Sequence, residues 1–204
     1  MRRLLILLIL CLGILSLTPV QAQTPMEKVL TQVDASQGLE VYFSLEGQLS
    51  AKQEEGVYYA MGKQFYMESP ILTAWYNGKD LWVYVLQNGE INLSNPTEEE
   101  LAEINPLTNL ALMQSKKMKV THKSIPGGIL FTAVPKLGYQ GSLTRITVKV
   151  DNQYKPTLLT VHDRGSETPL TVTISKIKKG IPHPSSLFTF DNSKAPGVTV
   201  VDLR

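Results

Sequence analysis

Three histidines are the side chains in this sequence best suited to acid–base or metal chemistry. His122, His162 and His183 are scattered and match none of the spacings, such as H-x-x-x-H or H-x-E, that place two ligands on one metal ion. His162 precedes Asp163, but neighbouring residues of a strand point to opposite faces of a sheet. We therefore expect surface or turn histidines and no metal site.

A second candidate for chemistry is the acidic run Glu98-Glu99-Glu100. It stands at the start of a predicted helix, where the helix dipole favours solvated acids. The sequence also has no G-x-S-x-G elbow, no phosphate-binding loop and no glycine-rich dinucleotide fingerprint. The sequence thus predicts neither an enzyme nor a cofactor. The alternative, an exported enzyme acting on lipids or glycans, requires convergent acids or a nucleophile–base pair inside a cavity.

Apolar and aromatic residues are more informative than the polar ones. The segment 81–86 is apolar at every position, whereas a half-exposed strand should alternate. One interpretation is an ordinary core. The other is a curved sheet whose apolar interior a lipid could occupy, with Leu107, Leu112 and Met113 on a helical lid. Methionine suits such a lid because its flexible thioether adapts to varied partners.

The first residues have the three parts of a secretory signal. Arg2 and Arg3 precede an apolar run from Leu4 to Leu15, and a small-x-small site ends at Ala22. The run is shorter than the roughly 20 residues that span a bilayer. We expect residues 1–22 to be cleaved and residues 23–204 to be exported to the periplasm.

Cleavage of the signal would also determine whether the protein is lipidated and what net charge it carries. The lone cysteine, Cys11, follows bulky Leu10 and lies inside the signal, so we expect no lipid anchor and no disulfide. Removing Arg2 and Arg3 from the 20 basic residues leaves 18 against 18 acidic ones. The mature chain therefore lacks the basic balance typical of nucleic-acid binding.

Beyond the signal, the hydrophobic period predicts one domain over residues 23–204. Thr24-Pro25-Met26-Glu27 is typical of a capped helix start, and residues 39–93 alternate as an antiparallel meander. A helical pair over 97–115, with a second helix starting at Pro106, precedes further strands over 118–177. Leu187–Phe190 and Val198–Val201 are predicted as short closing strands. A sheet this large curls, so we expect the helices inside it or over its mouth.

The segment Trp75-Tyr76-Asn77-Gly78-Lys79-Asp80-Leu81-Trp82-Val83-Tyr84 resembles the periplasmic outer-membrane lipoprotein carrier family (LolA). The ending Leu187-Phe188-Thr189-Phe190, followed by Pro196-Gly197-Val198, is similar to that of the family. The order of parts agrees over nearly all of residues 24–204.

The resemblance implies an α+β fold, mainly β: an unclosed antiparallel barrel of about 10–11 strands, with a helical lid over a hydrophobic cavity. It implies a carrier that shields the acyl chains of lipoproteins between the inner and the outer membrane. The implied partners are acylated lipoprotein cargo, an inner-membrane release complex and an outer-membrane acceptor. It further implies a monomer without cofactor or covalent chemistry.

The sequence departs from the family at one position. The family carriers have an Arg-Pro pair after the second strand, and that Arg helps to hold the lid shut. The matching stretch, Ala60 to Phe65, has Lys63 instead, which we take as the candidate lid latch. A lysine does not reproduce the guanidinium fork. The departure motivates an alternative, a sensor or interaction module that binds lipids or lipoproteins on the same fold.

The alternation of apolar and polar residues does not show which face of each strand lines the cavity, so candidates are taken from both faces. The acyl-chain cavity and lid candidates are Phe43, Leu45, Tyr58, Phe65, Met67, Trp75, Trp82, Tyr84, Leu107, Leu110 and Met113.

Overall fold

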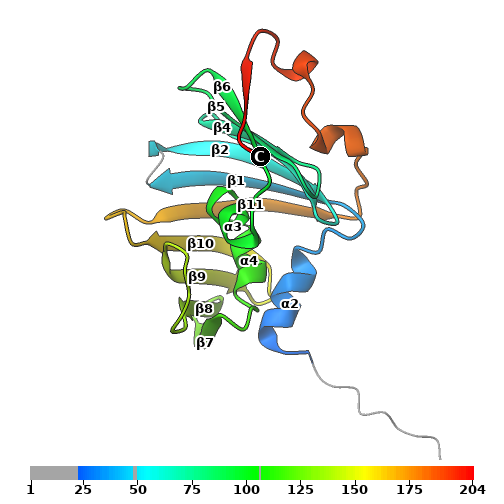
Figure 1. Ribbon diagram of the computed structural model, residues 1–204. Coiled ribbons are helices and arrows are strands. Elements are labelled where there is room, and N and C mark those ends of the chain that lie inside the picture. The colour runs from blue at the N-terminus through cyan, green and yellow to red at the C-terminus, as the bar shows by residue number, and fades with distance from the viewer. Residues whose placement is uncertain (1–22, 48–49, 106) are drawn as a thin grey trace, which may run out of the picture.

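The computed structural model describes residues 23–47, 50–105 and 107–204 (Figure 1). The predicted signal peptide, 1–22, and Pro106, the predicted start of the second mid-chain helix, lie outside the described residues. No helix within the described ranges is long and apolar enough to cross a membrane.

Twelve strands of the described chain form one sheet in the order β12-β6-β5-β4-β3-β2-β1-β11-β10-β9-β8-β7. The strands are β1 (Leu39–Gly47), β2 (Ser50–Met61), β3 (Gln64–Glu68), β4 (Leu72–Tyr76), β5 (Leu81–Val85), β6 (Glu90–Ser94), β7 (Met118–Ile125), β8 (Gly128–Pro135), β9 (Leu143–Asp151), β10 (Pro156–Asp163), β11 (Leu170–Lys179) and β12 (Thr199–Asp202). The outermost strands, β12 and β7, do not pair with each other, so the sheet stays open. The predicted unclosed barrel is confirmed, with one or two strands more than expected.

The N-terminal helix α2 (Pro25–Gln32) begins as its sequence predicts. The Thr24 hydroxyl accepts a hydrogen bond from the Glu27 amide at 3.3 Å, and the Glu27 carboxylate accepts one from the Thr24 amide at 2.6 Å. These two bonds satisfy amides that have no partner inside the helix. Met26 and Val29 of its apolar stripe are buried in the main core.

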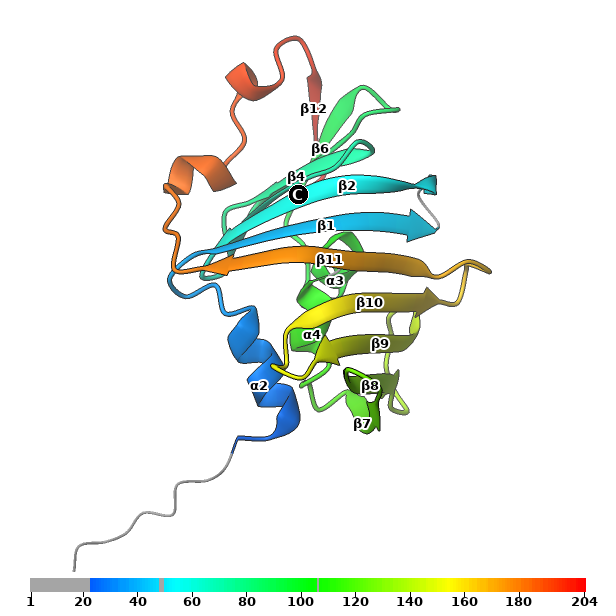
Figure 2. The same ribbon diagram turned by 180° about the vertical axis from the view of Figure 1, so that it is seen from behind.

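The helical pair expected over 97–115 is present as α3 (Glu98–Ile104) and α4 (Thr108–Leu112). A second capping box, between Thr97 and Glu100, starts α3. Both helices lie against one face of the sheet, in front of the strands in Figure 1 and behind them in Figure 2. This helix-covered face is called the inner face below, and the opposite one the outer face.

The C-terminal segment differs from prediction at two points. Leu187–Phe190 is no strand: the described chain forms a 3-10 helix there, Ser185–Phe188, which buries Phe188. The second predicted strand exists as β12, but it runs parallel to β6, whereas we expected antiparallel order throughout. Segment 180–198, which contains two 3-10 helices in the described chain, carries the chain from β11 to that edge of the sheet.

Strand alternation divides the apolar residues into two clusters. The main core lies on the inner face and includes Val41, Phe65, Ala74 and Leu81. The second cluster holds Trp75, Ile91 and Phe190, so it lies on the outer face, under the C-terminal segment. A strand such as β4 serves both clusters because Ala74 and Trp75 point to opposite faces.

Candidate functional site

A cavity of about 500 Å³ lies between the helices and the inner face of the sheet. Its lining is mainly apolar: the aliphatic part comes from α2, from the chain just after it and from the α3–α4 pair. The lining residues are Leu30, Val33, Asp34, Ala35, Leu39, Tyr58, Gly62, Lys63, Phe65, Tyr76, Gly78, Glu98, Leu101, Asn105, Leu107, Thr108, Leu110, Ala111, Leu112 and Ser115. A volume of this size is in the range of small-molecule sites.

Three aromatic rings from adjacent strands form the floor of this cavity. Tyr58 of β2 stacks on Phe65 of β3 with ring centres 5.7 Å apart, and Phe65 contacts Tyr76 of β4 at 5.4 Å. All three face inward because the pairing of β2, β3 and β4 puts them on one side. The floor is therefore aromatic, and α3 and α4 form a cover above it.

One buried hydrogen bond joins the cover to the floor. The Asn105 side-chain amide donates to the Tyr58 hydroxyl at 3.2 Å, and its carbonyl oxygen accepts from the Leu107 amide at 3.0 Å. Asn105 ends α3 and is only 1% exposed. Burial raises the pKa of Tyr58 to about 12, and the bond from Asn105 opposes that rise. At neutral pH the phenol is therefore uncharged.

The predicted latch residue behaves differently, because Lys63 lies in the exposed β2–β3 turn. It lines the cavity, but within the described part of the chain its ammonium makes no hydrogen bond or ion pair. A buried contact between the cover and the sheet is made by Asn105 and Tyr58. Tyr58 is among the predicted cavity residues, whereas Asn105 is not, although an asparagine at a helix end is a common local capping signal.

The remaining candidates fall into two groups, according to the face of the sheet on which they lie. Leu107 and Leu110 line the cavity with Tyr58 and Phe65, whereas other inward residues belong to the packed core around it. The core group is Phe43, Leu45, Met67 and Met113.

Three aromatic candidates lie on the other side of the sheet. Trp75 is part of the outer cluster, and Trp82 and Tyr84 pack against that cluster. Each alternates with an inward residue, as Trp82 does with Leu81 and Val83. The uniformly apolar run 81–86 thus reflects two apolar clusters, one on each face, and these three residues do not line the helix-covered cavity.

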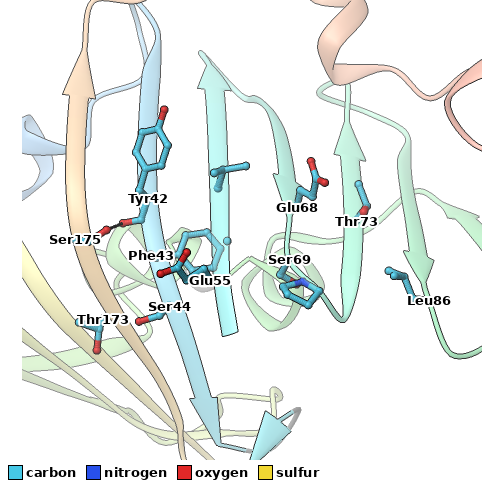
Figure 3. A pocket seen from close by; sticks show the side chains of 13 residues that line it. Tyr42, Phe43, Ser44, Glu55, Glu68, Ser69, Thr73, Leu86, Thr173 and Ser175 are labelled. Carbon is cyan, nitrogen blue, oxygen red and sulfur yellow. Dashed lines mark hydrogen bonds between the residues drawn. The ribbon is translucent and has the colours of Figure 1, made fainter. Parts of the chain in front are cut away.

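A second hollow, of about 740 Å³, lies on the outer face of β1–β4 and β11 (Figure 3). Its walls mix the two kinds of side chain: carboxylates from Glu55 and Glu68 and hydroxyls from Thr73 and Ser175 lie beside apolar residues such as Leu86. The Ser175 hydroxyl donates to the Tyr42 carbonyl at 3.1 Å. No sequence pattern predicts this groove, because it depends on the register of five strands.

An open, mainly antiparallel sheet with helices over an apolar cavity defines the class of half-barrel proteins with a covered interior. Within that class, the chain belongs to the outer membrane lipoprotein carrier protein LolA family, whose model matches residues 17–165. The family assignment made from the Trp75–Tyr84 segment is confirmed.

Solved structures are similar to this chain at low sequence identity. A conserved protein from Thermus thermophilus has the same fold, with a TM-score of 0.52 at 11% identity, over 88% of this chain and 99% of that one. A DUF1329 family protein from Desulfovibrio piger has a TM-score of 0.47 at 11% identity, over 81% and 95%. A LolA superfamily protein from Nitrosomonas europaea has a TM-score of 0.45 at 11% identity, over 84% and 98%. No curated protein sequence matches this chain.

Proposed function

We propose that this protein is a periplasmic carrier that shields the acyl chains of lipoproteins in the helix-covered cavity and moves them from the inner to the outer membrane. The observation that carries this proposal is the largely apolar cavity of about 500 Å³ under α3 and α4. Family membership supports the same function. The role requires no cofactor and no covalent step, so the protein is proposed not to be an enzyme.

The proposal includes several parts that follow from the sequence. Residues 1–22 act as a cleaved export signal, and residues 23–204 act as one unlipidated, monomeric domain. The partners are acylated lipoprotein cargo, a release complex at the inner membrane and an acceptor at the outer membrane.

The energetics suit a shuttle. Each buried methylene group contributes about 0.8 kcal/mol, so a fully shielded acyl chain would bind tightly. A cover that closes over the empty cavity lowers the apparent affinity, because the protein must open before it binds. The buried contact between Asn105 and Tyr58 is suited to this role, since it joins the cover to the sheet.

The test is binding of a diacylated lipopeptide to residues 23–204, measured by displacement of a fluorescent fatty acid. Leu101→Glu places a carboxylate in the cavity lining, and we expect it to weaken binding about tenfold or more because the acyl chain would desolvate that charge. Leu86→Glu is the matched control, because Leu86 is exposed and lines the outer groove. Equal losses in both variants, or no lipopeptide binding by the unaltered protein, would contradict the proposal.

A second candidate function is a sensor that binds lipids or lipoproteins and signals to a partner protein. The absence of the family Arg between Ala60 and Phe65 favours it, because the cover is held by a different contact. Depletion in cells separates the two. A carrier predicts that outer-membrane lipoproteins accumulate at the inner membrane, whereas a sensor predicts normal sorting and an altered transcriptional response.

A further inference from the structure

The outer face of the C-terminal half of the sheet has a regular pattern that the cavity does not use. Five threonines lie in register across β7, β8, β9, β10 and β11, each paired with the next. They are Thr121, Thr132, Thr147, Thr160 and Thr171. Their row places neighbouring side chains about 5 Å apart, and it marks the side of these strands that points away from the helices.

Four cations lie on the same side, two residues before or after a threonine of the row. Lys119 and Lys123 flank Thr121 in β7, and Arg145 and Lys149 flank Thr147 in β9. Residues two apart in a strand share a face. Lys119, Lys123, Arg145 and Lys149 are called the basic face below.

The strands between and beside these cations contribute uncharged side chains to the same rows. Leu130 pairs with both Lys123 and Lys149, and Val134 pairs with Lys119. On the far side, Leu158 pairs with Lys149 and His162 with Arg145. Across β7–β10 the two rows of cations are thus filled by leucine, valine and histidine side chains and contain no carboxylate. Acids border this face: Asp151 follows Lys149 by two residues, and Glu46 pairs with Thr171.

The basic face is not neutralised by the protein itself. All four cations are exposed, and none forms an ion pair in the described part of the chain. Arg145 lies 3.3 Å from the His162 ring through Nη2 and Nε2. Burial and the charge of Arg145 lower the pKa of His162, whereas Asp163 opposes that shift. The region is thus electropositive although the mature sequence has balanced charge.

The geometry of the basic face fits an extended surface better than a pocket. Neither the inner cavity nor the outer groove is lined by any of its four cations. Lys123 and Lys149 are two strands apart, about 10 Å, and Lys119 and Lys123 are four residues apart along a strand, about 13 Å. The four charges are thus spread over two dimensions, with apolar side chains between them. Such an arrangement is complementary to a plane of anionic groups.

We propose that the basic face docks reversibly on the surface of a bilayer containing anionic phospholipids. Lysine and arginine would contact headgroup phosphates, and the threonine hydroxyls would donate hydrogen bonds to phosphate oxygens. Each cation near an anionic surface strengthens binding by about fivefold. Four cations thus give an attachment that is weak enough to reverse. Docking would leave α3 and α4 uncovered, because they lie on the opposite face (Figure 2).

The test is co-sedimentation of residues 23–204 with vesicles of phosphatidylglycerol and phosphatidylcholine, against vesicles of phosphatidylcholine alone. We expect binding to the anionic vesicles only, and its loss at high salt because exposed charges are screened. Lys123→Ala with Lys149→Ala should weaken binding about 25-fold, the product of two fivefold losses. Lys79→Ala with Lys176→Ala is the control, since both lysines are exposed and lie outside the basic face.

The outcomes separate this proposal from the carrier function. The K123A/K149A variant should keep its affinity for the diacylated lipopeptide, because neither lysine lines the cavity. Equal binding to neutral and anionic vesicles, or equal losses in the two double variants, would overturn membrane docking. Failure to bind anionic vesicles at low salt would also overturn membrane docking, even if the same face were found to bind an acidic protein.

Discussion

At the scale of single residues, Glu40 and Lys178 make a short contact across β1 and β11 on the outer face. Lys178 Nζ lies 2.6 Å from Glu40 Oε2, and the Tyr42 hydroxyl donates to the same oxygen at 3.2 Å. The hydrogen bond from Lys178 lowers the pKa of Glu40, and the same bond raises the pKa of Lys178. Folding thus favours the charged forms of both groups.

The contact predicts a particular dependence of stability on pH. Because the pKa of Glu40 is lower when folded, its contribution is present above the ordinary glutamate pKa of about 4.3 and is lost as pH falls below it. Because the pKa of Lys178 is raised, its share is lost as pH rises beyond about 10.4. We expect the difference in Tm between the native protein and Glu40→Gln to shrink between about pH 7 and about pH 3. A difference that stays constant in a thermal melt series would contradict this account.

A second residue-scale feature is the glycine opposite Phe43. Gly56 pairs with Phe43 across β1 and β2, and a methyl group on Gly56 would lie 2.6 Å from that ring. We expect Gly56→Ala to lower the free energy of unfolding by about 1–3 kcal/mol, as overpacking does. Gly165→Ala is the control, because a methyl group there meets open space and should change stability by less than about 0.5 kcal/mol. Urea denaturation of both variants measures the difference.

At the scale of elements, the cover α3–α4 is held to β2 by side chains 47 positions apart in sequence. A hydrogen bond of this kind contributes about 1 kcal/mol. If it forms only in the closed state, Tyr58→Phe should favour opening and raise the apparent affinity for an acyl ligand about fivefold. The measurement is a ligand titration of the variant beside the native protein.

The control for this prediction removes a tyrosine hydroxyl on the other face of the sheet. The Tyr66 hydroxyl donates to Glu68 at 2.5 Å, on the outer face, so Tyr66→Phe should leave acyl affinity unchanged. A Tyr58→Phe protein with lower affinity would mean that the hydroxyl serves the ligand rather than the cover.

At the scale of the whole molecule, an open sheet has two edges that must be protected from pairing with other chains. The β7 edge carries exposed lysines, among them Lys119 and Lys123. The other edge is the short β12, which covers β6, and Arg204 beyond it reaches Asp80 at 3.2 Å. The C-terminal strand thus completes the sheet at the end opposite to β7.

Removal of β12 tests this role. A chain ending at Val198 would expose the edge of β6, and we expect it to self-associate in a concentration-dependent way, measured by light scattering after size exclusion. Arg204→Ala keeps β12 but loses the contact with Asp80, so it should remain as dispersed as the native protein. A truncated chain that behaves like the native one would show that β12 does not protect the edge.

Local signals made much of this molecule predictable. The capping box at Thr24 starts α2 as expected, because the bonds that form it lie within one helical turn. Asn77 and Gly78 mark the turn between β4 and β5, where Gly78 has a φ of +98° that favours glycine. The wrong strand at Leu187–Phe190 arose because a short apolar run does not by itself distinguish a strand from a helical turn.

Most element types, most turns and the family were predictable, because caps, periodicity and motifs depend on residues close together in the chain. Which face of each strand meets the helices became clear only from the packing, since the alternation of side chains is the same read from either side. It placed Trp75 and Trp82 outside and Tyr58 inside. Strand register likewise produced the basic face, and the packing of α3 on the sheet brought Asn105 to Tyr58; no local pattern specifies either.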